Sequence, residues 1–285
     1  MLVVVGTVPD PGIPILVGEV GTSEGQITVT DRSFPVNRGT PALLAAALQV
    51  SRTLGQPPPS ACLVGDIGLG DGSRRLYRFL CENTEQMECD VIVFHYLQPD
   101  VDWHNRVLFA LQEMARTPIL IADAGFMYAA KMSGEAEAYD LFTPDIGELS
   151  FLADEKAPHP FYTRGFILHM EERVPEMIAR AYRFQNAARC LLVKGNRDYV
   201  ADREGIRAII DSPSVATLEP IGGTGDTLTG IAAALIDSGM PLQDAAQMAA
   251  GINRLAGHYA KPTPATQVSE IIDHIPRALR ELIHA

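Results

Sequence analysis

Three glycines and an aspartate stand at the start of a predicted helix, in the segment GGTGD at residues 222–226. Apolar residues recur at helical spacing from Leu228 to Leu235, so the glycines fall where the helix begins. A helix N-terminus carries unpaired N–H groups and about half a positive charge, which suits it to hold a phosphate. The backbone predicted to form this anion site comprises Gly222, Gly223, Thr224 and Gly225.

Asp226 follows these glycines directly. A carboxylate inside an anion site is electrostatically unfavourable unless it takes part in the chemistry. We therefore interpret Asp226 as a general base that accepts the proton of a hydroxyl group attacking phosphorus. A simple glycine-rich turn, with Asp226 as an ordinary carboxylate at a helix N-terminus, explains the local pattern equally well, because short glycine-rich motifs are weak evidence.

The rest of the chain alternates between short apolar runs and helical patterns, as in a parallel sheet with crossover helices. Buried strands are predicted at residues 2–6, 61–65, 90–95, 118–123, 141–143 and 190–194. Helices are predicted at residues 42–54, 73–82, 103–115, 171–187, 226–238, 242–259 and 268–283, and from Leu149. The fold class predicted is α/β: one domain over residues 1–285, with a mostly parallel sheet flanked by helices on both faces and ligands at the carboxyl ends of the strands.

Three stretches interrupt this alternation. Prolines and a strand-like pattern at 27–31 predict an irregular or hairpin region over one rim of the sheet, at residues 7–37. Residues 158–166 break the pattern again, and residues 199–210 predict an antiparallel hairpin.

The composition limits the classes of protein that the chain can be. The 285 residues are 47% hydrophobic with a formal net charge of -12, which disfavours a general nucleic-acid binder. The four cysteines form no CxxC pair and no zinc-ligand spacing, so we expect free thiols in a reducing compartment. No signal-peptide pattern and no apolar run near ~20 residues is found, so we expect a cytoplasmic protein that does not enter membranes.

With these elements in order, the sequence resembles the ribokinase-like superfamily. GGTGD (222–226) is similar to its phosphate-binding loop and catalytic aspartate. LFTPDIGELSFL (141–152) is similar to the segment whose glutamate organises magnesium, and CLLVKGNRDYV (190–200) to the strand and turn before the nucleotide site. Residues 37–55 are similar to the early small-residue helix that borders the substrate; there, Thr40 before Pro41 predicts an N-cap.

Within the superfamily, the sequence is most similar to the NAD(P)H-hydrate dehydratases of the YjeF type. LVKG and GGTGDTLTGIAAAL stand where that family has VLKG and GGTGDVL, and the helix at 245–260 is similar as well. The chain departs from the family at Asp145, where a histidine is usual, at FHYLQPD (94–100) instead of a GPGLG-like turn, and at DAGFM (123–127) instead of DADAL. The nucleotide half is thus better preserved than the substrate half.

The resemblance implies phosphoryl transfer from ATP or ADP with Mg2+. The hydroxyl of hydrated NADH or NADPH would be phosphorylated and phosphate then eliminated. One alternative is a kinase of the PfkB or ribokinase type acting on a small sugar or vitamin alcohol. A second is a catalytically degenerate relative that only binds nucleotide, although the intact Asp226 and glycine loop weigh against it.

The resemblance also implies roles for single residues. Asp226 would be the base and Glu148 would organise the metal, while Lys194 and Gly195 would join the glycine loop at the nucleotide. The residues predicted to contact substrate are Asn37, Arg38, Gly39, Asp123 and Asp145. From the residues alone, Lys194 is as readily a surface lysine, Asp123 a loop cap and residues 37–38 a solvated loop.

Two further features leave alternatives open. His95 ends a predicted strand, where a single histidine is more often structural than ligand-binding. The alanine-rich helices at 42–50 and 245–260 could pack between subunits of a homo-oligomer, but the interpretation that they cover the sheet is favoured.

Overall fold

The computed structural model describes all residues except 24, 158–170 and 285, so the predicted break at 158–166 lies outside the described residues. Six neighbouring strands are parallel, in the order β9-β8-β7-β6-β1-β5. Their bounds are β1 (Leu2–Val8), β5 (Ser60–Gly65), β6 (Val91–His95), β7 (Ile119–Ala122), β8 (Leu141–Phe142) and β9 (Cys190–Val193). All six were predicted from their apolar runs. Every residue of β1 is buried, as expected for a strand covered on both faces.

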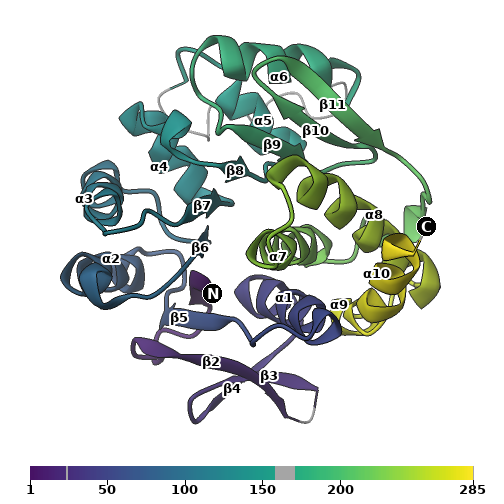
Figure 1. Cartoon of the computed structure of the whole chain (residues 1–285), viewed down its shortest axis with the longest axis horizontal. Helices are drawn as coiled ribbons and strands as arrows, with labels where there is room; N and C mark the ends of the chain where they lie inside the picture. Colours follow the sequence, from purple (N-terminus) through teal and green to yellow (C-terminus); the bar gives the residue numbers. More distant parts are fainter. Residues whose placement is uncertain (24, 158–170, 285) are drawn as a thin grey trace.

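Antiparallel strands extend both edges, giving eleven strands in the described residues. These strands are β2 (Leu16–Ser23), β3 (Gln26–Val29) and β4 (Arg32–Pro35) beyond β5, and β10 (Asp198–Asp202) and β11 (Gly205–Ile210) beyond β9. The hairpin of β10 and β11 confirms the prediction for residues 199–210. The prediction that residues 7–37 lie over a rim was wrong in part, because β2 pairs with β5 and continues the sheet (Figure 1).

Helices cover both faces of the sheet (Figure 1). One face carries α2 (Asp71–Asn83), α3 (Val101–Gln112), α4 (Gly125–Ser133), α5 (Ile146–Leu152) and α6 (Val174–Arg183). The other carries α1 (Thr40–Leu54), α7 (Thr224–Asp237), α8 (Leu242–Ala260), α9 (Val268–Ile272) and α10 (Ile275–Ile283). Short 3-10 turns lie at Thr84–Gln86, Ala136–Ala138, Glu171–Arg173 and Ala216–Leu218. Successive residues of β1 enter opposite cores, Val3 on the α2 side and Val4 on the α1 side.

Three helix predictions need correction. Helix α4 was not predicted; it follows β7 after only Asp123 and Ala124. The single helix expected at 268–283 is two helices, and Pro276 opens the second. Thr40 is not the N-cap of α1: Gly39, with φ 69°, takes that place, and the Thr40 hydroxyl donates instead to the Thr7 carbonyl oxygen.

The close crossing of α1 and α7 determines where the two helix starts meet. A Cβ on Gly230 would lie 2.2 Å from the Leu43 carbonyl oxygen, so only glycine permits this approach. The alanine-rich face of α1 is buried in this contact and in the core, as the sheet-covering interpretation predicted. None of the helices in the described part of the chain could span a bilayer.

Candidate active site

The start of α7 forms the glycine loop that the sequence predicted. Gly223 is the N-cap with φ 98°, and a Cβ there would lie 3.1 Å from the Arg38 Cα atom, so the loop at 37–39 packs directly against it. Because no side chain caps this helix, its first N–H groups remain available to an anion. Asn37 and Arg38 are exposed beside the loop, where the sequence predicted substrate contacts.

Asp226 lies in the first turn of α7 and is only 7% exposed. Its Oδ2 accepts the Gly39 N–H at 2.6 Å, and its Oδ1 lies 3.2 Å from His95 Nε2. Burial works to raise the pKa of Asp226, but His95, Lys194 and the Gly39 N–H outweigh burial and lower it. Asp226 is therefore ionised near neutral pH, as a proton acceptor must be.

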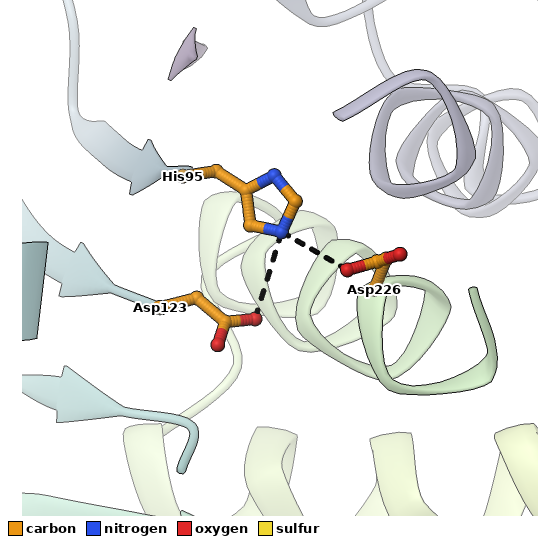
Figure 2. Close-up of side chains that lie close together, drawn as sticks. All are labelled: His95, Asp123 and Asp226. Carbon is orange, nitrogen blue, oxygen red and sulfur yellow. Dashed lines mark hydrogen bonds and ion pairs between the residues drawn. The ribbon is translucent and has the colours of Figure 1, made fainter. Parts of the chain in front are cut away.

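His95 is fully buried at the carboxyl end of β6. Its Nδ1 lies 3.0 Å from Thr40 Oγ1, and its Nε2 points toward Asp226 and toward Asp123 Oδ2, 3.8 Å away (Figure 2). From the sequence we expected His95 to be structural, but the structure places it between Thr40, Asp123 and Asp226. A signal was present: β6 and β7 are parallel with Phe94 opposite Ala122, so the next residues, His95 and Asp123, are neighbours.

Asp123 and Lys194 form a largely buried ion pair beside Asp226. Lys194 Nζ lies 2.9 and 3.0 Å from the two oxygens of Asp123, whose Oδ2 also accepts the Thr229 hydroxyl at 2.6 Å. Burial opposes the lysine charge, but Asp123 and Glu148 outweigh burial and raise the pKa of Lys194. Lys194 is thus not a surface lysine: its aliphatic chain lies against Gly225, and its charge faces the glycine loop.

A second pair of acidic residues begins α5. Asp145 is the exposed N-cap and accepts the Glu148 N–H at 2.7 Å, while Glu148 Oε2 accepts the Asp145 N–H at 2.8 Å. Burial and the Asp145 charge raise the pKa of Glu148 to about 8. Carboxylates crowded in this way suit a hydrated Mg2+, which prefers oxygen ligands and would relieve their repulsion. The residues present therefore fit the metal that the sequence predicted at Glu148.

A buried ion pair, which was not predicted from the sequence, holds the turn after Lys194 against α8. Arg254 of α8 donates to Asp198 Oδ2 at 2.7 Å and to the Gly195 carbonyl oxygen at 3.0 Å. Asp198 also accepts the Gly195 N–H at 3.1 Å. Outside this turn lies a pocket of about 470 Å³ whose lining includes Ile146, Asn196, Arg197, Tyr199 and Ser214.

The predicted site residues therefore gather at one edge, formed by the starts of α1, α5 and α7 and the ends of β7 and β9. Two of them are buried: Asp226 is 7% exposed, and Asp123, at 2%, makes its contacts to the protein. Asp145 and Lys194 join in a parallel bridge, which ties the α5 start to the lysine.

Comparisons with known proteins match this chain to a family model and to relatives in other organisms. A family model described as NAD(P)H-hydrate dehydratase, of the carbohydrate-kinase type, matches residues 97–277. An uncharacterised protein of Methanocaldococcus jannaschii, MJ1337, is 38% identical over 242 residues, covering 85% of this chain and 100% of that protein. The bifunctional NAD(P)H-hydrate repair enzyme Nnr of Hyperthermus butylicus is 40% identical over 97 residues, covering 33% of this chain and 18% of the enzyme.

A solved structure extends the likeness to the whole fold. The ADP/ATP-dependent NAD(P)H-hydrate dehydratase of Bacillus subtilis, co-crystallised with ATP and Mg2+, matches with a TM-score of 0.60 at 15% identity. The match covers 98% of this chain and 91% of that one. At this identity the likeness shows the fold, which both chains share.

Proposed function

The chain belongs to the carbohydrate-kinase family described as NAD(P)H-hydrate dehydratase, and from that premise we propose that it uses ATP or ADP to repair hydrated NADH or NADPH. The observation that carries the proposal is Asp226, a buried carboxylate kept ionised at the start of a helix whose N–H groups are uncapped. This arrangement supports the proposal, because phosphoryl transfer to a hydroxyl needs a base beside an anion site.

The proposed reaction balances with the residues of this edge. Asp226 accepts the proton of the substrate hydroxyl as its oxygen bonds to the terminal phosphorus of the nucleotide, and the bond from that phosphorus to the nucleoside phosphate breaks. The amides of Gly223–Gly225 and the Lys194 ammonium face the charge on the phosphoryl oxygens. The carbon–oxygen bond to the phosphate then breaks, and the adjacent carbon loses a proton, so that phosphate leaves and the double bond of the dihydronicotinamide is restored.

The nucleotide is proposed to extend from the glycine loop over the Lys194–Gly195 turn into the pocket of about 470 Å³. Arg254 supports this turn by donating to the carbonyl oxygens of Gly195 and Asn196, which ties the pocket wall to α8. Mg2+, organised by Glu148, would neutralise phosphate charge when bound. We further propose that residues 1–285 act as one domain in a reducing compartment, where the four free cysteines persist.

A kinase that leaves a stable phosphate ester is the second candidate, and one observation favours it. The family match begins at residue 97, whereas Gly39, which contacts Asp226, and strands β2–β4 lie before it. Three of the five residues predicted to contact substrate, Asn37, Arg38 and Gly39, thus lie in the part of the chain that the family model does not match.

The test is an assay on purified protein offered hydrated NADH with ATP or ADP and Mg2+, in which returning NADH is followed by its absorbance. The matched control, Asp226→Asn, is expected to bind nucleotide normally and to lose about 10²–10⁴-fold of turnover, because the amide accepts no proton. NADH recovery that depends on nucleotide and on Asp226 would support the dehydratase. Nucleotide turnover with a panel of sugars and vitamin alcohols, without NADH recovery, would favour the kinase, and nucleotide binding without either would favour a degenerate relative.

A further inference from the structure

The hydrogen bonds around His95 determine where its protons lie. Thr40 has one hydroxyl hydrogen and donates it to the Thr7 carbonyl oxygen, 2.8 Å away. Thr40 Oγ1 can therefore only accept in its contact with His95 Nδ1, at 3.0 Å. It follows that Nδ1 of His95 carries a hydrogen.

The other ring nitrogen faces carboxylates. His95 Nε2 lies 3.2 Å from Asp226 Oδ1 and 3.8 Å from Asp123 Oδ2, and all three residues are buried (Figure 2). A lone pair on Nε2 would oppose the carboxylate lone pairs at hydrogen-bond distance, which is costly at low dielectric. A hydrogen on Nε2 converts this repulsion into a charge-assisted hydrogen bond.

That hydrogen could belong to Asp226 instead, but the contacts of the second carboxylate oxygen argue against a neutral acid. Asp226 Oδ2 accepts the Gly39 N–H at 2.6 Å, and the Lys194 charge lies nearby. Both interactions stabilise the ionised carboxylate, so the proton belongs on the imidazole.

The charges of the side chains around His95 favour a proton on its ring over a metal ion bound beside it. The side chains His95, Asp123 and Asp226 offer ligand atoms within 4.8 Å of one another, which could hold a cation. Lys194, however, already pairs with both oxygens of Asp123, and its charge would repel a divalent ion. With an imidazolium, two buried positive charges meet two negative ones. The titratable and charged groups that face His95 in the described residues are Asp226 of α7, Asp123 after β7, Tyr96 after β6, and Lys194 after β9 through Asp123.

We propose that His95 is a positioning residue held as an imidazolium cation, whose Nε2–H orients the Asp226 carboxylate toward the substrate hydroxyl and keeps it ionised. The inference rests on the proposed phosphoryl transfer for its consequence in turnover. His95 is fully buried and so acts through Asp226. Held at Oδ1 by His95 and at Oδ2 by Gly39, the carboxylate has a fixed plane, which is the alignment that a weak base needs.

The protonation state is tested directly by nitrogen NMR on protein labelled with 15N-histidine, without substrate or metal. Both ring nitrogens of His95 are expected to resonate as protonated nitrogens at neutral pH, with His95→Gln giving the assignment. His104 is an internal reference, because it is equally buried and burial lowers its pKa to about 4, so that it stays neutral. A neutral His95 would overturn the proposal, as would His95 signals that change when zinc or magnesium is added, which would indicate a metal site.

The role in turnover is tested by pH profiles of His95→Gln and of the matched control His104→Gln. Glutamine can donate to Asp226 but carries no charge, so the pKa of Asp226 rises. The acid limb of kcat should move up by about 1–3 pH units in His95→Gln, the effect of one adjacent opposite charge, with KM nearly unchanged. His104→Gln should leave the limb in place. An equal loss at every pH would mean that His95 is merely structural. Absence of any turnover in wild type, with a cationic His95 in the spectrum, would contradict the proposed function alone.

Discussion

The helices α5 and α7 each carry a carboxylate as their third residue, yet the pKa values of the two carboxyl groups are shifted in opposite directions. The pKa of Asp226 in α7 is lowered, whereas that of Glu148 in α5 is raised to about 8. Both helices begin at the carboxyl edge of the sheet, and both acids lie near Lys194. The helix dipole favours a negative charge at both, so it cannot account for the difference.

The opposite pKa shifts follow from the different N-cap residues of the two helices. At α5 the Asp145 side chain caps the helix, and Glu148 folds back to the Asp145 N–H, so two acids stand together. At α7 the N-cap is Gly223, which has no side chain, and Asp226 reaches across to Gly39 and His95 on other elements. One helix start therefore concentrates negative charge suited to a cation, and the other isolates a single ionised base.

Lys194 carries a positive charge close to both helix starts. Its replacement is therefore expected to have the largest effect on the two sites. Lys194→Met leaves Asp123, 2% exposed, without its partner, and a broken buried pair costs about 3–5 kcal/mol of the free energy of unfolding. Urea denaturation measures this loss. In the double variant with Asp123→Asn, the amide oxygen can still accept from Thr229, so much of the stability should return. A single variant as stable as wild type would show that the pair does not hold the two sites together.

Features formed by residues close together in the sequence could be predicted, whereas contacts between distant residues could not. The glycine loop and the six parallel strands follow from local patterns, and both were predicted. The capping box of α5 is local as well, but it was missed, because the helix was predicted to begin at Leu149 and not at Ile146. The contacts that keep Asp226 ionised join residues 131 and 187 positions apart, and no local pattern contains them. His95 was undervalued for this reason, since its partners come from three other parts of the chain: α1, the end of β7 and α7.

Thr40 is a case in which the local sequence pattern gave a wrong prediction. Its sequence context, before Pro41, is typical of an N-cap, and the local pattern was misleading. The hydroxyl serves β1 and His95 instead, because the crossing of α1 over α7 brings it there. Tertiary packing thus decided the partner of a side chain whose local preference pointed elsewhere.

Glu148→Gln separates the two acids by their dependence on pH. With a pKa of about 8, Glu148 gains its charge as pH rises through this value, so wild type should need less Mg2+ at pH 9 than at pH 7. The variant should need about 10–100-fold more Mg2+ for half-maximal turnover at pH 9 and lose this pH dependence. Glu270→Gln, which removes the same kind of capping carboxylate from α9, is the matched control and should leave the Mg2+ titration unchanged.

The raised pKa of Glu148 also makes the free energy of unfolding depend on pH. Between pH 4.5, the ordinary pKa, and about 8, folded Glu148 holds a proton that the unfolded chain has lost. Stability therefore falls as pH rises across this window, and Glu148→Gln should remove that part of the fall. A Mg2+ titration identical to that of wild type at both pH values would remove Glu148 from the metal site.

Asp145 gives the smallest effect and tests whether the α5 start is only a cap. Asp145→Ala loses the bond to the Glu148 N–H and should cost about 0.5–2 kcal/mol, measured by thermal denaturation, while Asp145→Asn keeps the cap and most of that stability. If Asp145 only caps α5, Asp145→Asn should also keep the KM for the hydroxyl substrate. The sequence placed Asp145 among the substrate contacts, and a KM raised in Asp145→Asn at unchanged stability would support that role. The α5 start would then bind substrate as well as metal, and the division between the two helix starts would be narrower than their pKa values imply.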